Sequence, residues 1–509
     1  MPCRHSRLLM IIAIGLLVGL LASAAAQSTQ AAAPSSSTGA ASAPAAPATS
    51  APAAPASATP TYATPAPAAS VPATPAPAHS SAAPAATPDN AAAKLAEKRR
   101  ETILYGIDSE IIDLLGSLDR EKDGEFNADL LSLFTQSTND KLRVTILGLF
   151  ADLKWNGAEK TAIDLVTNRD SESTPLVYGA LSYLAAIRSK QALSFSSVLV
   201  KEDNKSLLPA LIDLMGRAGG APEEAQLLSW FDSDNFDQNL REDTIKALGE
   251  IGSAKAAAKL DSIVEDDQEP MPSRVFACQS LAKIKDPVSV PSLIKAANGG
   301  DPYVRAAAVE ALSHFSTPQS DAAIVQALRD SVANVRIAAC KAAGSRDIAS
   351  AFPFLKYKAT SDPSSPVQIE AYKALAQLGG PAFSFLRSRI GDEKESYEIR
   401  ALCFGLLASK DPGGSMPLLE KTLTAAAADT DRSLYTDFAR AVAYATDAPQ
   451  AGPLAKIFLA DKDYLIRIAA VDWARNSKVT AFKPILADLA KNDPSGVIRR
   501  SAAAVLASL

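Results

Sequence analysis

Apolar residues recur along the chain in short helical stretches, each separated from the next by an acidic or polar turn. Between residues 126 and 509 the same order repeats twelve times: an apolar helix, an aspartate, a Val-Arg pair or its equivalent, and then alanines. A fixed period of this length indicates an array of repeated units and not a compact globule. The arginine position recurs every 31 to 33 residues, at Arg241, Arg274, Arg305, Arg336, Gln368 and Arg400, and again from Arg467 to Arg499.

Each repeat contains two types of predicted helix. One is short, has a proline near its start and carries leucine or isoleucine toward the core, as in residues 291–294 and 484–486. Proline is tolerated there because the N–H groups of a first helical turn have no partner to lose. The other type starts near the aspartate and continues through the Val-Arg pair into the alanines. Strand-like alternation is absent from the sequence, so we expect an all-α solenoid of about twelve helix pairs.

Three segments precede the array. Residues 1–26 combine two arginines, an apolar run and a stretch of alanines, which is the pattern of a secretory signal peptide, although the run could also remain as a membrane anchor. Residues 27–88 contain no charged residue and hold 13 of the 33 prolines, so we predict a disordered tether over 27–90. Two helices over 91–124 are predicted to cap the array, which then occupies residues 125–509.

Charge argues against a nucleic-acid partner. The formal net charge is -5, and no basic stripe is visible in the sequence. Positions five residues after each arginine, which should face the concave side, carry mixed signs, so we expect no nucleic acid as a partner. These positions are Lys246, Gln279, Glu310, Lys341, Lys373, Gly405, Asp472 and Ala504.

Three cysteines follow the repeat period. Cys278, Cys340 and Cys403 are 62 and 63 residues apart, which is two repeats each time. Helices that pack 8 to 10 Å apart would place them about 20 Å from one another, too far for a disulfide. We therefore expect them to be buried as small apolar residues and not to bridge or bind a metal.

The helix pairs resemble HEAT repeats, in particular the bacterial phycobilisome-lyase-like type. The resemblance rests on the Pro-x-Leu-Ile helix, the aspartate, the Val-Arg pair and the small residues after it, and it covers residues 125–509. It implies a right-handed superhelix in which the Val-Arg helices line the concave side and the aspartates and arginines form a ladder between repeats. The matching aspartates are Asp301, Asp362, Asp463 and Asp493, and the pattern is interrupted where Gln368 replaces arginine.

Reactive chemistry is sparse in the sequence. His5 and His79 lie in the first two segments, so His314 is the only imidazole of the array, and no phosphate loop, nucleophile elbow or zinc motif occurs. We therefore predict no catalytic residue, no cofactor and no metal site, and we expect that the protein is not an enzyme.

The sequence predicts a non-catalytic scaffold that is exported to the periplasm or cell envelope of a bacterium and binds a protein through its extended surface. Membrane contact is expected only through an uncleaved signal, and we expect a monomer. The alternatives are a lyase-like accessory factor that holds a ligand in the groove and a structural spacer. The candidate partner-binding residues are Arg336, Lys341, Tyr357, Tyr372 and Lys373.

Overall fold

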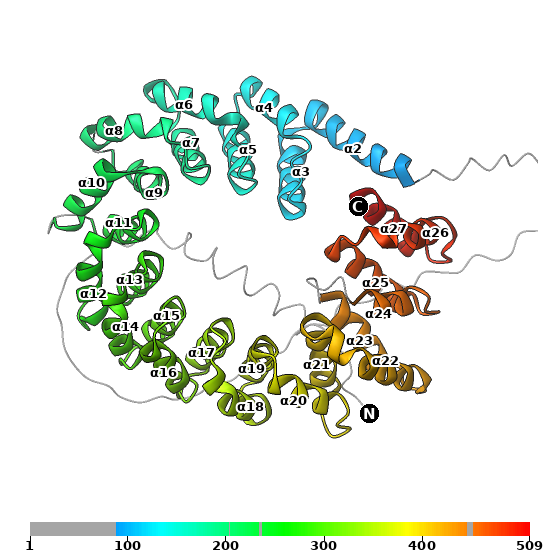
Figure 1. Ribbon diagram of the computed structural model, residues 1–509. Coiled ribbons are helices and arrows are strands. Elements are labelled where there is room, and N and C mark those ends of the chain that lie inside the picture. Colours follow the sequence, from blue (N-terminus) through cyan, green and yellow to red (C-terminus); the bar gives the residue numbers. More distant parts are fainter. Residues whose placement is uncertain (1–87, 203, 234–236, 445–450) are drawn as a thin grey trace, which may run out of the picture. The chain divides into compact units, whose positions relative to one another are not determined.

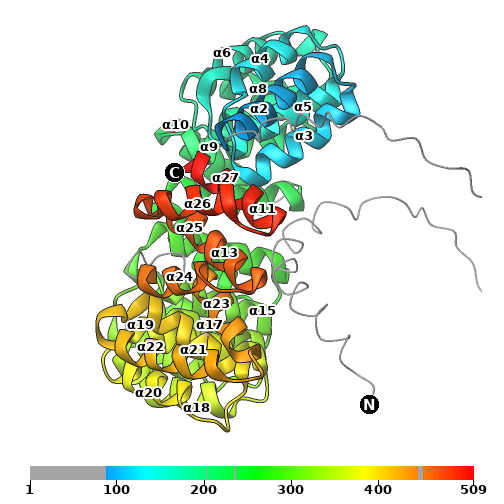
Figure 2. The same ribbon diagram turned by 90° about the vertical axis from the view of Figure 1, so that its right-hand side faces the viewer.

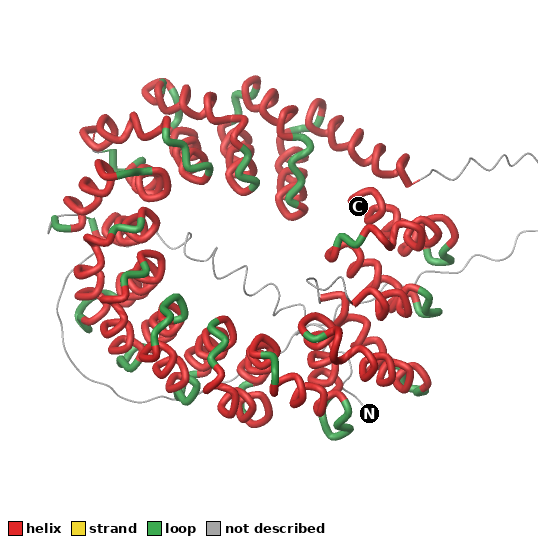
Figure 3. Tube along the Cα trace, in the orientation of Figure 1, coloured by secondary structure: helices red, strands yellow, loops and turns green. Residues whose placement is uncertain are grey.

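The structure is a computed structural model that describes residues 88–509 except 203, 234–236 and 445–450. Within this part of the chain all regular structure is helical, with helices joined by short loops and no strand (Figure 3). The predicted signal peptide and nearly all of the predicted tether lie outside the described residues. The described residues belong to one compact unit, and the all-α prediction is confirmed for it.

The helices alternate between two sides of a curved row, even-numbered helices outside and odd-numbered helices inside (Figure 1). The outer helices are α2 (Pro88–Tyr105), α4 (Asn127–Gln136), α6 (Glu159–Thr167), α8 (Ser196–Glu202), α10 (Ala221–Phe231), α12 (Ala257–Glu265), α14 (Val290–Ala297), α16 (Pro318–Ala327), α18 (Phe352–Ser361), α20 (Pro381–Ile390), α22 (Pro412–Ala428), α24 (Gly452–Leu459) and α26 (Lys483–Asn492). The inner helices are α3 (Asp108–Glu121), α5 (Asp140–Asp152), α7 (Thr174–Ala186), α9 (Leu208–Ala218), α11 (Gln238–Ile251), α13 (Met271–Ile284), α15 (Pro302–Leu312), α17 (Ala333–Ser345), α19 (Ser365–Leu378), α21 (Tyr397–Lys410), α23 (Ser433–Tyr444), α25 (Tyr464–Ser477) and α27 (Gly496–Ser508).

Each outer helix packs against the inner helix that follows it, and each inner helix contacts the inner helices before and after it. The apolar faces of all these helices form one continuous core that runs from Ile103 to Val505. Consecutive repeats therefore bury one another's apolar faces, as expected of a solenoid. From α4 onward the described residues contain the expected twelve helix pairs, preceded by the pair α2 and α3.

Small residues allow neighbouring inner helices to approach closely. A Cβ added to Gly216 in α9 would lie 2.7 Å from the Cα of Ala247 in α11, and one added to Gly344 in α17 would lie 2.9 Å from the Cα of Ala374 in α19. These distances leave no room for a side chain at the glycine. Gly405, which we expected on the concave side, is likewise buried where α21 meets α23, because an added Cβ would approach the Ala441 carbonyl oxygen to 2.9 Å.

The first described helix contacts the last one. Helix α2 packs against α27, and Figure 2 shows the two side by side. In α27, Val505 is fully buried, while Leu506 and Leu509 are partly buried against the core. Helix α2 therefore covers part of the terminal repeat of the same chain in addition to starting the array.

The junction between α19 and α21 differs from its neighbours. Two glycines separate α19 from α20: Gly379, with a φ of +63°, follows the end of α19, and Gly380, with a φ of +49°, precedes α20. The ψ angles of -152° and -121° place both residues in regions that only glycine visits readily. Gln368 occupies the arginine position here, and its Nε2 donates to the carbonyl oxygen of Asp362 at 2.6 Å.

Candidate functional site

A ladder of arginines and aspartates fixes one repeat on the next. Arg336 donates from Nε and Nη2 to the two carboxylate oxygens of Asp362 in the following repeat, at 2.8 and 2.7 Å. Its Nη1 donates to the carbonyl oxygens of Asp330 and Ser331 in the loop before its own helix, at 2.9 and 3.0 Å. The planar guanidinium thus holds two loops at once, which a lysine could not do with the same geometry. The corresponding pairs include Arg305 with Asp330, Arg432 with Asp461, and Arg467 with Asp493.

The expected ladder contains two kinds of aspartate with different roles. Asp301 and Asp463, four residues before the arginine, cap their own helices by accepting backbone N–H bonds, and we were wrong to place them in the ladder. Asp362 and Asp493 stand six residues before the arginine position and accept from the arginine of the preceding repeat. Asp330 belongs to this second group, because it stands six residues before Arg336 and accepts from Arg305 of the preceding repeat. It was not among the aspartates predicted for the ladder.

The ladder carboxylates are held in the charged state. Burial opposes the ionisation of Asp362, but hydrogen bonds from Arg336 and from the backbone N–H of Ser364 outweigh it and lower its pKa. Hydrogen bonds from arginine and from backbone N–H groups likewise outweigh burial at Asp330 and Asp493 and lower the pKa of both. The negative charges of the ladder are therefore satisfied inside the array and are not available to a partner.

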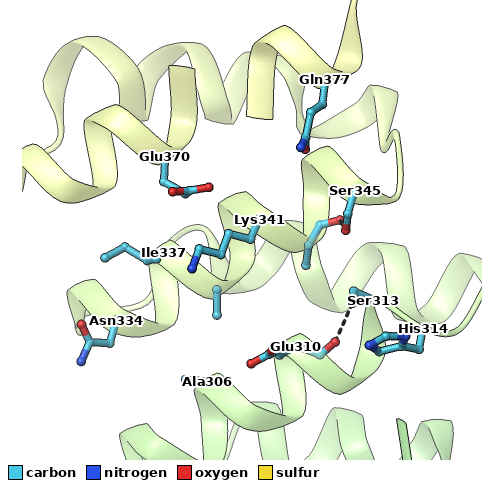
Figure 4. Close-up of a pocket in the computed structure, with 12 residues that line it drawn as sticks. Ala306, Glu310, Ser313, His314, Asn334, Ile337, Lys341, Ser345, Glu370 and Gln377 are labelled. Carbon is cyan, nitrogen blue, oxygen red and sulfur yellow. Dashed lines mark hydrogen bonds between the residues drawn. The ribbon is translucent and has the colours of Figure 1, made fainter. Parts of the chain in front are cut away.

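A hollow opens on the inner side of the array over α15, α17 and α19. Its volume is about 470 Å³, and Figure 4 shows the side chains that line it. We call it the inner groove. The floor consists of small or apolar residues on α15 and α17, and the rim carries polar and charged side chains from all three helices. The floor residues are Ala306, Ile337, Ala338 and Ala342, and the rim residues include Glu310, His314, Asn334, Lys341, Glu370 and Gln377.

The position of each rim residue follows from the repeat. Glu310 and Lys341 are exposed and lie five residues after Arg305 and Arg336, so consecutive helices present them at the same level. His314 and Gln377 stand nine residues after the corresponding position in their repeats. The side chains at these offsets line the groove, because residues at equal offsets occupy the same face of successive inner helices. The groove therefore shows a partner a negative charge on α15 and a positive charge on α17, and Glu370 adds a second carboxylate on α19.

Comparison with known families identifies the repeat type. Residues 103–508 match the family described as spirochaete HEAT repeat protein. The chain belongs to this family. The HEAT repeat prediction is confirmed, and the matched segment reaches further toward the N-terminus than the predicted start at residue 125, because it includes α3. No curated protein matches the chain significantly.

Solved structures that resemble the HEAT array are distant in sequence. The complex of CpcE and CpcF of phycocyanin lyase from Nostoc sp. PCC7120 is 20% identical, with 46% of this chain and 92% of that chain covered and a TM-score of 0.29. Human deoxyhypusine hydroxylase is 17% identical over 51% of this chain and 98% of that chain, with a TM-score of 0.24. The karyopherin Kap121p is 11% identical over 81% of this chain, which spans 53% of that chain, with a TM-score of 0.38.

The HEAT array separates the five predicted partner-binding residues. Lys341 lines the inner groove, and Lys373 is exposed on α19, where its Nζ lies 3.5 Å from the Glu370 carboxylate. Arg336 is 6% exposed and serves the ladder. Tyr372 is 1% exposed and stacks on Phe385 with ring centroids 6.2 Å apart, so it is a core residue and cannot anchor a partner directly.

Tyr357 lies elsewhere on the molecule. It is 62% exposed on the outer helix α18, where it lines a second hollow of about 380 Å³. The other lining residues include Phe354 and Arg329, whose guanidinium carbon is 4.7 Å from the Phe354 ring centroid. Tyr357 is therefore on the outer side of the array and Lys341 on the inner side, and one compact partner segment could not contact both.

The structure places the chemically reactive residues apart from one another. Cys278, Cys340 and Cys403 are free and buried, and burial raises the pKa of Cys278 and of Cys340 to about 12. The prediction that they are structural and unbridged is confirmed. Over the described residues, no three or more histidine, cysteine or acidic side chains gather in a way that could hold a metal ion. No helix in this part of the chain is both long and apolar enough to span a bilayer.

Glu370 lines the inner groove but was not among the residues predicted to face the concave side. It stands two residues after Gln368, whereas the positions predicted to face the concave side stand five residues after the arginine. Counting every third or fourth residue along the inner helix would have included it, since residues at this spacing share one face.

Proposed function

We propose that this protein is a non-catalytic scaffold that binds another protein along the inner side of its HEAT array. The observation that carries the proposal is the inner groove, where three consecutive helices supply an apolar floor and a charged rim. Protein interfaces combine such an apolar centre with a polar margin. A rigid ladder beneath the groove supports this role, because a preformed surface loses little conformational freedom on binding.

The groove fits a protein segment better than a small cofactor. A ligand-holding accessory factor would need an apolar cavity with a few converging polar groups. The described lining residues include no phenylalanine, tyrosine or tryptophan, and the rim carries charges of both signs. Among the described residues, the imidazole of His314 forms no hydrogen bond with a serine or a carboxylate of the groove, as a catalytic pair would require.

Residues 1–26 support a location outside the cytoplasm, in the periplasm or cell envelope, because they have the charge and apolar pattern of an export signal. Fractionation followed by N-terminal sequencing tests this part of the proposal. The expected result is an envelope protein that begins near Gln27. Full-length protein in the cytoplasm would contradict it.

Site-specific crosslinking tests the binding function. A photo-crosslinking residue is introduced in place of Ser345, which lines the groove, or in place of Glu420, which is exposed on the outer helix α22. In the cells that express the protein, we expect a discrete protein adduct from position 345 and none from position 420. No adduct from any inner position of α15, α17 or α19 would exclude a protein partner at this surface.

A further inference from the structure

The inner groove also indicates which kind of segment it binds. Three charged residues stand in one line across the array: Glu310 on α15, Lys341 on α17 and Lys373 on α19, each five residues after the arginine position of its repeat. All three are exposed. Among the described residues Glu310 and Lys341 form no ion pair, and in Figure 4 the Lys341 amino group points to the same open side as the Glu310 carboxylate.

The third charged residue of the line, Lys373, is also accessible to a partner. Lys373 pairs with Glu370 at 3.5 Å, but half of the Lys373 side chain is exposed. An exposed pair of this type contributes little free energy, so a better-placed carboxylate from a partner could replace it. At the positions five residues after the arginine position, the line therefore reads negative, positive, positive, and the Glu370 carboxylate, which lines the groove, lies beside Lys373.

The spacing of the line matches an α-helix. Packed inner helices are about 8 to 10 Å apart. A helix that crosses them presents side chains on one face about every seven residues, or about 10.5 Å. Long charged side chains can absorb the remaining difference. The alanine floor beneath the line gives room for the apolar stripe of such a helix, as in other helix-in-groove complexes.

We propose, on the basis of the proposed scaffold function, that the inner groove binds an amphipathic α-helix of a protein partner. The partner helix carries a basic residue opposite Glu310 and acidic residues opposite Lys341 and Lys373, at intervals of about seven residues. Its small or apolar side chains between these charges rest on Ala306, Ile337 and Ala338. Charge complementarity sets the register, and the apolar floor contributes most of the affinity.

A designed peptide tests the proposal with the full chain. The probe is an alanine- and leucine-based helix with Arg, Glu and Glu on one face at seven-residue intervals. A control probe of the same composition scatters the three charges around the helix. A third probe keeps the cognate charges but contains a central proline that breaks the helix. Fluorescence anisotropy should show that the cognate probe binds at least about tenfold more tightly than either control.

Charge reversal in the groove then tests the register. Lys341→Glu should weaken the cognate probe about tenfold, and a probe whose middle glutamate is replaced by arginine should recover the lost affinity on this variant. Lys421→Glu on the outer helix α22 is the matched control and should leave binding unchanged, because Lys421 is exposed on the other side of the array.

Three results would overturn the proposal: no binding of the cognate probe, equal binding of the scattered probe, or equal binding of the proline-containing probe, which would indicate an extended partner. Crosslinking distinguishes a failure of the helical-partner proposal from a failure of the proposed scaffold function. If crosslinking at position 345 still captures a protein while Lys341→Glu has no effect on its capture, the scaffold function stands and the helical partner does not.

Discussion

At the scale of single residues, what an arginine contributes depends on the neighbour it meets. Arg336 and Arg499 occupy the same position in their repeats, and each donates from Nη1 to carbonyl oxygens of the loop before its own helix. Arg336 also reaches Asp362, whose side chain is 0% exposed. Arg499 is exposed and meets no carboxylate among the described residues. Comparing the two arginines therefore shows what the ion pair between repeats contributes to stability.

Replacing these arginines should have very different consequences. Arg336→Ala leaves a buried carboxylate without its main partner and should cost about 3 to 5 kcal/mol. Arg499→Ala removes only bonds near solvent and should cost less than about 1 kcal/mol. Native-state hydrogen exchange across α17 and α19, and across α27, measures the two effects locally. Similar losses in both variants would show that the carboxylate adds nothing to the ladder.

The residue scale also shows how far the sequence could be interpreted. The period located the arginines, and the buried cysteines followed from it, because a repeat fixes which face of a helix a position occupies. The repeat period alone did not predict that Tyr372 is buried in the core. That residue sits one position before Lys373, and a rotation of about 100° per residue separates the exposed side chain of Lys373 from the buried one of Tyr372.

At the scale of elements, the junction between α19 and α21 is where the regular construction changes. Gln368 makes only the bond to its own loop, and the arginine of the next repeat, Arg400, donates from Nε to the carbonyl oxygen of Ile390 at 2.9 Å. Neither forms an ion pair with a later repeat among the described residues. Within the described chain, this junction, which contains Gly379 and Gly380, therefore lacks the arginine–aspartate pair that joins the repeats on either side of α17.

The backbone of this junction should tolerate no side chain at Gly379. Alanine at a φ of +63° and ψ of -152° is strained, and its Cβ would lie 3.3 Å from the Phe383 ring, so Gly379→Ala should cost about 1 to 3 kcal/mol. Gly391→Ala is the matched control, because Gly391 has a helical φ of -84° and open space around its α-carbon. Thermal unfolding compares them. An unchanged melting temperature in Gly379→Ala would mean that the loop rearranges freely.

Element boundaries were predicted well where proline or aspartate marks them and less well elsewhere. Helix α15 begins at Pro302 after its capping Asp301, as expected. Helix α2 instead begins at Pro88, within the segment predicted as tether, because the alanines after it extend the charged helix toward the N-terminus. Helix α3 is preceded by Ile107 at the N-cap, so Asp108 is its first residue and not its cap.

At the scale of the whole described array, one type of charge pair is repeated through it, so the array should respond to acid as a unit. Hydrogen bonds from arginine and from backbone N–H groups overcome burial and lower the pKa of Asp330, Asp362, Asp461 and Asp493. A carboxyl group whose pKa is lower in the folded state contributes stability above its unfolded pKa. That contribution is lost as the pH falls through the folded value.

The melting temperature should therefore stay nearly constant from about pH 7 to pH 5 and fall steeply below about pH 4. Asp362→Asn should begin from a lower melting temperature and lose less of it between pH 5 and pH 3, because one titrating group is gone. Glu420→Gln, on the exposed surface of α22, should keep the wild-type profile. An acid profile of Asp362→Asn that parallels the wild type would assign acid unfolding to other groups.

The contact between α2 and α27 has a mechanical consequence. Residues 1–87 join the array at the start of α2, so a pulling force transmitted through them acts first on the helix that covers the last repeat. Separation of α2 from α27 would open the array between its two ends, while α2 would still contact α3 and α4. The inner groove would remain, because α15, α17 and α19 contact one another independently of α2.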